Sequence, residues 1–181
     1  MYQKEKELSS EKIFDGIVVK LFRDEIELED GSRGVREFIK HPGGVCIAAV
    51  DEDEQLYMVE QFRYPFGKVL TEVPAGKLEF GEDPEECGRR ELKEEVGANA
   101  DSFEYLGCIY PTVAYDTEII YMFLAKGLHF GEQHLDDGEF LDVKKIPLKK
   151  AFQMVMDNEL PDAKTQMAVL KAYMKLHGSE V

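Results

Sequence analysis

The sequence has no tryptophan, only three cysteines, and far fewer bases than acids. Cys46, Cys87 and Cys108 are odd in number and far apart, so they predict neither a disulfide framework nor a zinc knuckle and suit a reducing cytosol. Against 37 Asp and Glu residues stand 22 Lys and Arg residues, which leaves a formal charge of −15. Such a charge disfavours nucleic-acid polymers and anionic membrane surfaces as partners.

Long apolar runs are missing as well. The longest run, "IIYMFLA" at residues 119–125, is too short to span a bilayer. The N-terminus has no apolar signal core, so we expect a soluble, cytoplasmic protein. With 181 residues, of which 44% are hydrophobic, the chain can fold as one domain or as one domain with an appendage.

Short alternating segments dominate the first half of the chain. Residues 16–28 and 35–40 flank the turn "EDGSRG" and predict a small antiparallel β meander. Further strands are predicted over residues 45–50, 56–64, 68–73, 103–110 and 117–125. The segments 148–160 and 162–176 place apolar residues three and four apart, which predicts two amphipathic helices. The fold class is therefore α/β (α+β), with a meander over 1–42 and a larger domain over 43–181.

A third helix is predicted over residues 84–96. Asp83 can act as its N-cap, Pro84 suits the first helical position, and Gly97 suits a C-terminal cap. Among its charges, Glu85 with Arg89 is an acid-before-base pair four residues apart. Glu86 with Arg90 is a second such pair, and both are expected to be ordinary surface pairs.

The last turn of this helix does not follow the same logic. Glu91, Glu94 and Glu95 lie on one face, and Glu91 with Glu95 is a like-charge pair that weakens a helix. Acids near a helix C-terminus also oppose the macrodipole. The alternatives are a solvated surface and a bound cation, and hard oxygen donors of this kind select Mg²⁺, Mn²⁺ or Ca²⁺.

The spacing of the whole stretch carries a resemblance. Eight of nine fixed positions fit the pattern G-x5-E-x7-R-E-U-x-E-E-x-G-U, where U is a bulky aliphatic residue, and Ala98 occupies the ninth. The matching residues are Gly76, Glu82, Arg90, Glu91, Leu92, Glu94, Glu95 and Gly97. The stretch resembles the Nudix box, and "EQFRYP", "EVPAGKLEFGE", "DGEF" and "DAKT" look like the ADP-ribose pyrophosphatase branch. The resemblance implies an α/β/α sandwich with a mixed central sheet.

The resemblance also implies a metal site for Mg²⁺, with Mn²⁺ as the alternative. It assigns Glu91, Glu94 and Glu95 as metal-binding carboxylates and the backbone carbonyl of Ala75 as a further ligand. Glu82 has a supporting role near the metal ions, and Glu94 also belongs to the catalytic group. Arg90 is expected to act catalytically by orienting a neighbouring glutamate.

Substrate and water are assigned to other segments. Arg63 is expected to reach the substrate phosphates, because a guanidinium suits paired oxygen contacts. In the stretch "LDDGEF" the resemblance points to an acid that activates water, and we choose Glu139, with Asp136 and Asp137 as rivals. The meander resembles a segment that pairs two subunits, so we expect a homodimer in which Arg36 faces a neighbour's substrate.

The expected reaction is Mg²⁺-dependent hydrolysis of ADP-ribose, or of a related nucleoside diphosphate sugar, to AMP and a sugar phosphate. The loop "YPTVAYDTE" at 110–118 departs from the branch, because Pro111 is displaced and the loop has no glycine. Because of this departure, the substrate of the second alternative is another nucleotide: an oxidised purine nucleotide, NADH or a dinucleoside polyphosphate. A nucleotide-binding regulatory module without catalysis is a third alternative, against which the three glutamates argue.

Overall fold

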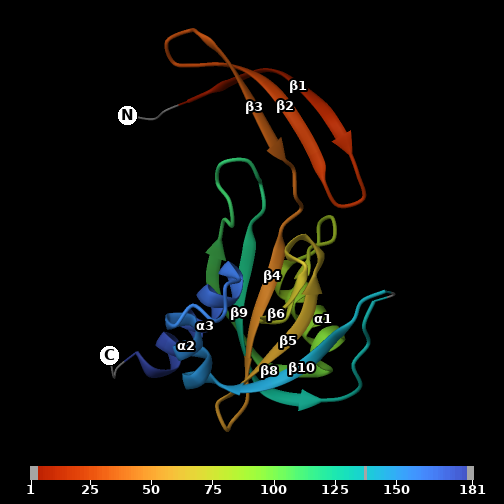
Figure 1. The fold of residues 1–181 in the computed structure, drawn as a ribbon, viewed down its shortest axis with the longest axis vertical. Helices are drawn as coiled ribbons and strands as arrows, with labels where there is room; N and C mark the ends of the chain where they lie inside the picture. The colour runs from red at the N-terminus through yellow and green to blue at the C-terminus, as the bar shows by residue number, and fades with distance from the viewer. Residues whose placement is uncertain (1–3, 137, 179–181) are drawn as a thin grey trace. The chain divides into compact units, whose positions relative to one another are not determined.

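The computed structural model describes residues 4–136 and 138–178, drawn as a ribbon in Figure 1. Contacts divide the chain into two compact units. The first contains Met1–Gly43 together with Tyr110–Ile119, and the second contains Gly44–Ile109 and Ile120–Val181. The strand pattern of the sequence did not predict that a segment as distant as 110–119 joins the first unit.

The first unit is built on an antiparallel sheet. Its described strands are β1 (Lys6–Asp15), β2 (Lys20–Glu27) and β3 (Arg33–Ile39), in the order β1-β2-β3. The meander predicted from the sequence is confirmed, although β1 was not foreseen because its sequence is mostly polar. Tyr110–Ile119 joins this unit through main-chain bonds, since the Ile39 N–H donates to the Tyr115 carbonyl at 2.8 Å and the Thr117 N–H donates to the Ile39 carbonyl at 3.0 Å.

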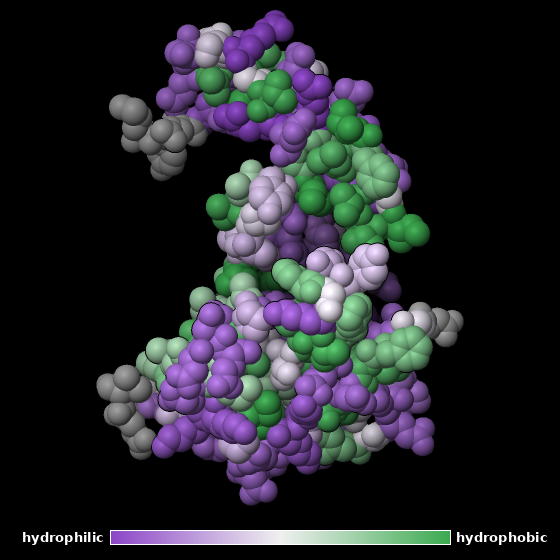
Figure 2. Space-filling view, in the orientation of Figure 1, coloured by the Kyte–Doolittle hydropathy of each residue, from purple (hydrophilic) through white to green (hydrophobic). Residues whose placement is uncertain are grey.

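The sheet β1–β3 has little core of its own. Among its described strand residues, Ile26 is the one buried hydrophobic side chain, and Asp24 is buried beside it with its Oδ1 lacking a hydrogen bond. Hydrophobic side chains lie at the surface among hydrophilic ones over this sheet (Figure 2). They include Leu8, Ile13, Phe14, Ile17, Val18 and Val35. A small three-stranded sheet with so little buried hydrophobic surface is marginally stable by itself.

The second unit contains a mixed sheet. In the described residues its order is β10-β5-β4-β9-β8, with β6 added to β5 and β7 added to β4. The strands are β4 (Gly44–Val50), β5 (Gln55–Arg63), β6 (Lys68–Glu72), β7 (Ala75–Lys77), β8 (Ala98–Ile109), β9 (Ile120–Phe130) and β10 (Leu141–Pro147). A one-turn helix, η1 (Tyr64–Phe66), follows β5. Strands β4 and β9 are parallel and the other pairs are antiparallel, so the expected mixed sheet is confirmed.

Helices cover both faces of this sheet. They are α1 (Pro84–Val96), α2 (Leu148–Met156) and α3 (Ala163–His177), and α1 lies on the face opposite α2 and α3 (Figure 1). The alternation of β4 divides the core. Cys46, Ala48 and Val50 belong to the cluster under α2 and α3, whereas Val45 and Ile47 belong to the cluster under α1. The α/β/α sandwich is therefore confirmed.

Two differences from the predicted elements have simple causes. Strand β10 was not foreseen, because it is an exposed edge strand whose residues alternate weakly in hydrophobicity. Helix α2 ends at Met156, earlier than the apolar spacing predicted, since Asn158 has a positive φ of 60° that breaks the helix. In the described part of the chain no helix is long and apolar enough to cross a membrane.

Candidate active site

The glutamates lie at the C-terminal end of α1, whose two predicted caps are both present. The Asp83 carboxylate accepts bonds from the Glu85 and Glu86 N–H groups. At the other end Gly97 has a φ of 70°, and its N–H reaches the carbonyls of the last turn. The predicted bounds, 84–96, are therefore confirmed.

The last turn is also tied down by the segment after β9. The His134 N–H donates to the Glu94 carbonyl at 3.0 Å, and the Gln133 side-chain amide donates to the Glu95 carbonyl at 2.6 Å. These bonds satisfy carbonyls that a helix end otherwise leaves open. They fix the backbone that carries two of the three glutamates, and sequence reasoning did not foresee them.

Gly76, on β7, makes room for Glu91. A Cβ built on Gly76 would lie 1.8 Å from the Glu91 Cδ and 1.9 Å from its Oε1. A side chain at position 76 would therefore displace the Glu91 carboxylate. The glycine that opens the sequence pattern thus has a packing reason in this structure.

Arg90 joins the glutamates to one another. Its Nη1 donates to the Glu91 Oε1 at 2.7 Å and to the Glu94 Oε2 at 3.0 Å. Its Nε donates to the Glu82 Oε1 at 3.0 Å, and this bond lowers the pKa of Glu82 to about 2. The surface pair predicted between Glu86 and Arg90 is wrong, because Arg90 turns toward these three acids instead.

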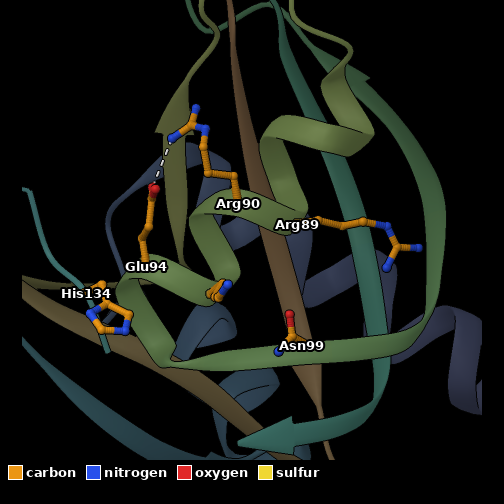
Figure 3. Close-up of a pocket in the computed structure, with 6 residues that line it drawn as sticks. Arg89, Arg90, Glu94, Asn99 and His134 are labelled. Carbon is orange, nitrogen blue, oxygen red and sulfur yellow. Dashed lines mark hydrogen bonds and ion pairs between the residues drawn. The ribbon is translucent and has the colours of Figure 1, made fainter. Parts of the chain in front are cut away.

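The neighbouring Arg89 behaves differently. It pairs with Glu85 at 2.8 Å, as predicted, and its guanidinium lies 4.7 Å from the ring centre of Phe103. Figure 3 shows Arg90 turned toward Glu94 while Arg89 extends to the other side of the helix. A hollow of about 450 Å³ beside them is lined by six charged or polar residues: Arg89, Arg90, Lys93, Glu94, Asn99 and His134.

Burial makes Glu95 the most perturbed acid of the group. It is 4% exposed, and burial raises its pKa to about 8, against the hydrogen bond that its carboxylate accepts from the Ala75 N–H at 3.0 Å. The charges of Glu91 and Glu139 raise it further. Burial also raises the pKa of Glu91. In the metal-free protein, nearby positive charge is therefore too small to offset the burial of the ionised Glu91 and Glu95 carboxylates.

Glu139 lies within electrostatic reach of this cluster, since its charge acts on both Glu91 and Glu95. Its carboxylate accepts a hydrogen bond from the Gln61 amide at 3.2 Å, and its N–H donates to the Asp136 carbonyl at 3.0 Å. Glu139 is therefore close enough to the glutamates for its charge to act on two of them. Asp137, one of its rivals, lies outside the described residues.

Arg63, at the end of β5, is held by Glu72. Its Nε and Nη2 each donate to one oxygen of that carboxylate at 2.7 Å. Arg63 and Glu95 also influence each other's pKa, so the guanidinium lies near the cluster. Arg36 belongs to the first unit, where its Nε donates to Glu5 at 3.0 Å. The buried Glu72 was not singled out from the sequence.

The acids fit a divalent cation. In the described residues no three His, Cys, Asp or Glu side chains converge as a ready metal site. One oxygen of Glu91 and one of Glu94 instead accept hydrogen bonds from Arg90, and one oxygen of Glu95 accepts a bond from the Ala75 N–H. Carboxylates whose charge is disfavoured by burial and mutual repulsion are the oxygen donors that a hard cation would stabilise.

A helix end rich in carboxylates, joined by one arginine and seated on an α/β/α sandwich, suits a divalent cation and chemistry on phosphate groups. The NUDIX domain family matches residues 40–169, and the chain belongs to this family. Members of the family generally use divalent metal ions.

Individual relatives agree with this assignment. The chain is 39% identical over 173 residues to the "ADP-ribose pyrophosphatase" of Bacillus subtilis (strain 168), covering 94% of each chain. It is 41% identical over 167 residues to the "Methanol dehydrogenase activator" of Bacillus methanolicus, covering 91% of this chain and 90% of that one. A solved "ADP compounds hydrolase" has the same fold, with a TM-score of 0.86, 22% identity, and coverage of 99% and 98%. The predicted resemblance to the ADP-ribose pyrophosphatase branch is confirmed.

Proposed function

We propose that this protein hydrolyses ADP-ribose, or a related nucleoside diphosphate sugar, to AMP and a sugar phosphate, with Mg²⁺ as the working ion and Mn²⁺ as a substitute. The observation that carries the proposal is the burial of Glu95 at the end of α1, next to the carboxylate of Glu91. Burial raises the pKa of Glu95 to about 8. The substrate class rests on the similarity to ADP-ribose pyrophosphatases. A "GDP-mannose pyrophosphatase" of Yersinia enterocolitica, 32% identical over 155 residues, supports the wider sugar class.

The residues at the helix end would share one metal site. Glu91, Glu94 and Glu95 would hold the ion, the Ala75 carbonyl would add a ligand, and Glu82 would support them through Arg90. When bound, a divalent cation supplies positive charge against the diphosphate and lowers the pKa of water. Arg90 would keep the carboxylates of Glu91 and Glu94 in place, as its bonds at 2.7 and 3.0 Å already do.

The remaining roles concern water and phosphate. Glu139 would accept a proton as the water oxygen bonds to phosphorus and the bridging P–O bond breaks, so that AMP and a sugar phosphate leave. Arg63 would contact the phosphate oxygens. We expect Glu139→Gln to reduce turnover by about a hundredfold or more, since general bases contribute at that level, while metal affinity measured by calorimetry stays nearly unchanged. Near-normal turnover would remove Glu139 from the mechanism.

The test of the proposal is a substrate panel. Purified protein is incubated with Mg²⁺ and ADP-ribose, nucleotide sugars, NADH, dinucleoside polyphosphates and oxidised purine nucleotides, and the products are separated by chromatography. We expect AMP and ribose phosphate from ADP-ribose, abolished by EDTA and by Glu95→Gln. Cleavage of another member alone would keep the reaction and change the substrate. Ligand binding without cleavage would instead support a regulatory module.

A second candidate comes from the relative in Bacillus methanolicus. That protein is named as an activator of a methanol dehydrogenase, and it is as similar to this chain as the pyrophosphatase is, at 41% against 39% identity. We infer that a dehydrogenase is a second partner to test, because NADH also contains a diphosphate bond. Adding the protein with Mg²⁺ to an NAD-dependent alcohol dehydrogenase and following its initial rate would test this, with Glu95→Gln as the control.

The first unit supports a homodimer as a further proposal. Its sheet exposes Phe14, Ile17 and Val18, and Ile26 is its one buried hydrophobic strand side chain among the described residues. A partner that covers these side chains would provide the burial that the meander lacks, and Arg36 would then face the neighbour's substrate. Light scattering at micromolar concentration should give twice the monomer mass, whereas a monomer would contradict the proposal. The predicted cytoplasmic location rests on the sequence alone.

A further inference from the structure

The segment "DAKT" at 162–165 forms the first turn of α3 and is bonded to the sheet beside the active site. The Asp162 carboxylate caps the helix, accepting bonds from the Thr165 N–H at 3.0 Å and from its hydroxyl at 2.6 Å. The Thr165 Oγ1 in turn accepts a bond from the Val73 N–H at 3.0 Å. The start of α3 is therefore fixed just before the strand that carries Ala75 and Gly76.

Within this turn, Lys164 points to a buried acid. Its Nζ contacts the Glu72 Oε2 and lies 3.0 Å from the Asp162 Oδ2. The Lys164 side chain is 13% exposed and that of Glu72 is 2% exposed. Charges this deeply buried persist in folded proteins when they are paired and hydrogen-bonded.

Glu72 therefore bridges two cations, Lys164 and Arg63. Arg63 uses its Nε and Nη2 for the carboxylate, and its Nη1 has no hydrogen bond among the described residues. The Arg63 side chain remains 38% exposed. Paired bonds from a guanidinium to a carboxylate fix the plane of the guanidinium, so the direction of the Nη1 edge depends on where Glu72 is held.

We propose that Lys164 is a positioning residue for diphosphate binding. By contacting the Glu72 Oε2, the oxygen that the Arg63 Nη2 also binds, it holds the Glu72 carboxylate in place and so fixes the plane of Arg63. It also balances part of the negative charge of Glu72. Arg63 then retains positive charge and an oriented N–H edge for phosphate oxygens. The inference rests on the proposed function, because it assumes that Arg63 contacts a phosphate group of the substrate.

A purely structural role makes a different prediction. If Lys164 only attaches α3 to the sheet, its loss would lower stability and leave the KM of the folded enzyme unchanged. If it positions Arg63, its loss would raise the KM for a diphosphate substrate more than it lowers kcat. The rise in KM would also require Arg63. In a variant that already lacks Arg63, the loss of Lys164 would therefore hardly change KM.

The experiment compares Lys164→Gln with Lys164→Arg and with Lys175→Gln. The glutamine removes the charge but keeps a donor for Glu72, the arginine keeps the charge, and Lys175 is a half-exposed residue of the same helix paired with Glu104. We expect Lys164→Gln to raise KM for ADP-ribose about tenfold, as for the loss of one charge-assisted contact, with kcat nearly unchanged. Lys164→Arg should have a KM close to that of the wild type, and Lys175→Gln should have the KM of the wild type.

Two further measurements separate the outcomes. In the background of Arg63→Ala, Lys164→Gln should change KM by less than about twofold, since the cycle isolates effects that pass through Arg63. The ¹⁵N signal of the Arg63 Nε–H should shift in Lys164→Gln and not in Lys175→Gln, and this readout requires no activity. An unchanged KM and an unchanged signal in folded Lys164→Gln, with the wild type active, would overturn the positioning role alone. A wild type that neither hydrolyses the panel nor binds ADP would overturn the proposed function as well.

Discussion

The two ends of α1 carry similar acids in different surroundings. At the start, Glu85 pairs with Arg89, and both side chains are nearly half exposed. At the end, Glu95 is buried, and Glu91 and Glu94 share Arg90. The comparison teaches that charge density along a helix does not distinguish a solvated surface from a site. What distinguishes them is whether the neighbouring strand and loop exclude water from the carboxylates.

The largest expected effect is on activity at the buried end. Glu95→Gln should reduce turnover by about a thousandfold or more, because a metal ligand supports several kcal/mol of transition-state stabilisation. Steady-state kinetics with Mg²⁺ would measure it, and circular dichroism would verify the fold. Activity within tenfold of the wild type would place the site elsewhere.

The same glutamate should give the metal-free protein a pH-dependent stability. The pKa of Glu95 in the folded protein is about 8, above its ordinary value of 4.5, so the folded state keeps a proton that the unfolded state releases. The associated stability is fully present below pH 4.5 and is lost as the pH rises through 8. Urea unfolding in EDTA should show this loss, on the order of a few kcal/mol.

Two controls sharpen the pH prediction. Glu95→Gln should flatten this part of the profile, because the amide does not titrate. Mg²⁺ should restore stability at high pH, because an ion that binds the folded state alone stabilises it. A wild-type profile in EDTA that does not fall between pH 5 and 9 would contradict the burial of a titrating Glu95.

The adjacent arginines provide a matched pair of intermediate effect. Arg90→Ala should lower turnover about 10-fold to 100-fold, as expected for a residue that orients metal-binding carboxylates. Arg89→Ala should leave turnover nearly unchanged and cost about 0.5–1 kcal/mol of stability through the loss of its contact with Phe103. The measurements are kcat and chemical denaturation of both variants. If Arg90→Ala and Arg89→Ala lost turnover equally, the conclusion that only Arg90 serves the site would be wrong.

The smallest effect is expected at the exposed end. Glu85→Gln should change the free energy of unfolding by only about 0.2–0.5 kcal/mol, because the pair is solvated and screened. The change should shrink further in high salt. A loss of activity in this variant would mean that the start of α1 also takes part in the site.

Local patterns predicted much of the fold correctly. Asp83, Pro84 and Gly97 gave α1 its bounds, because caps act on residues a few positions away. Five strands of the core sheet, β4, β5, β6, β8 and β9, followed from β-branched and aromatic segments, and the C-terminal helices followed from apolar spacing. Strand β1 and the edge strand β10 were missed, since both are polar and exposed and are defined by their pairing partners.

The candidate site was predictable in its motif and not in its contacts. The spacing of Glu91, Glu94 and Glu95 singled out one helix face without any coordinates. The same reasoning assigned Arg90 to Glu86, because it considered neighbours within the helix alone. It also passed over Gln61 and Lys164, whose partners Glu139 and Glu72 are 78 and 92 residues away in the chain.

The sequence by itself determined the helix that carries the acids, its caps and the family pattern, because these depend on residues within a few turns of one another. Only the tertiary structure decided which acids are buried, which arginine joins them, and which distant side chains hold Glu139 and Arg63. Burial and long-range pairing arise from the packing of β7, α1 and α3 around the core sheet. Rules that relate neighbouring residues do not predict this packing. The burial of the acids and their pKa values are therefore known only from the folded structure.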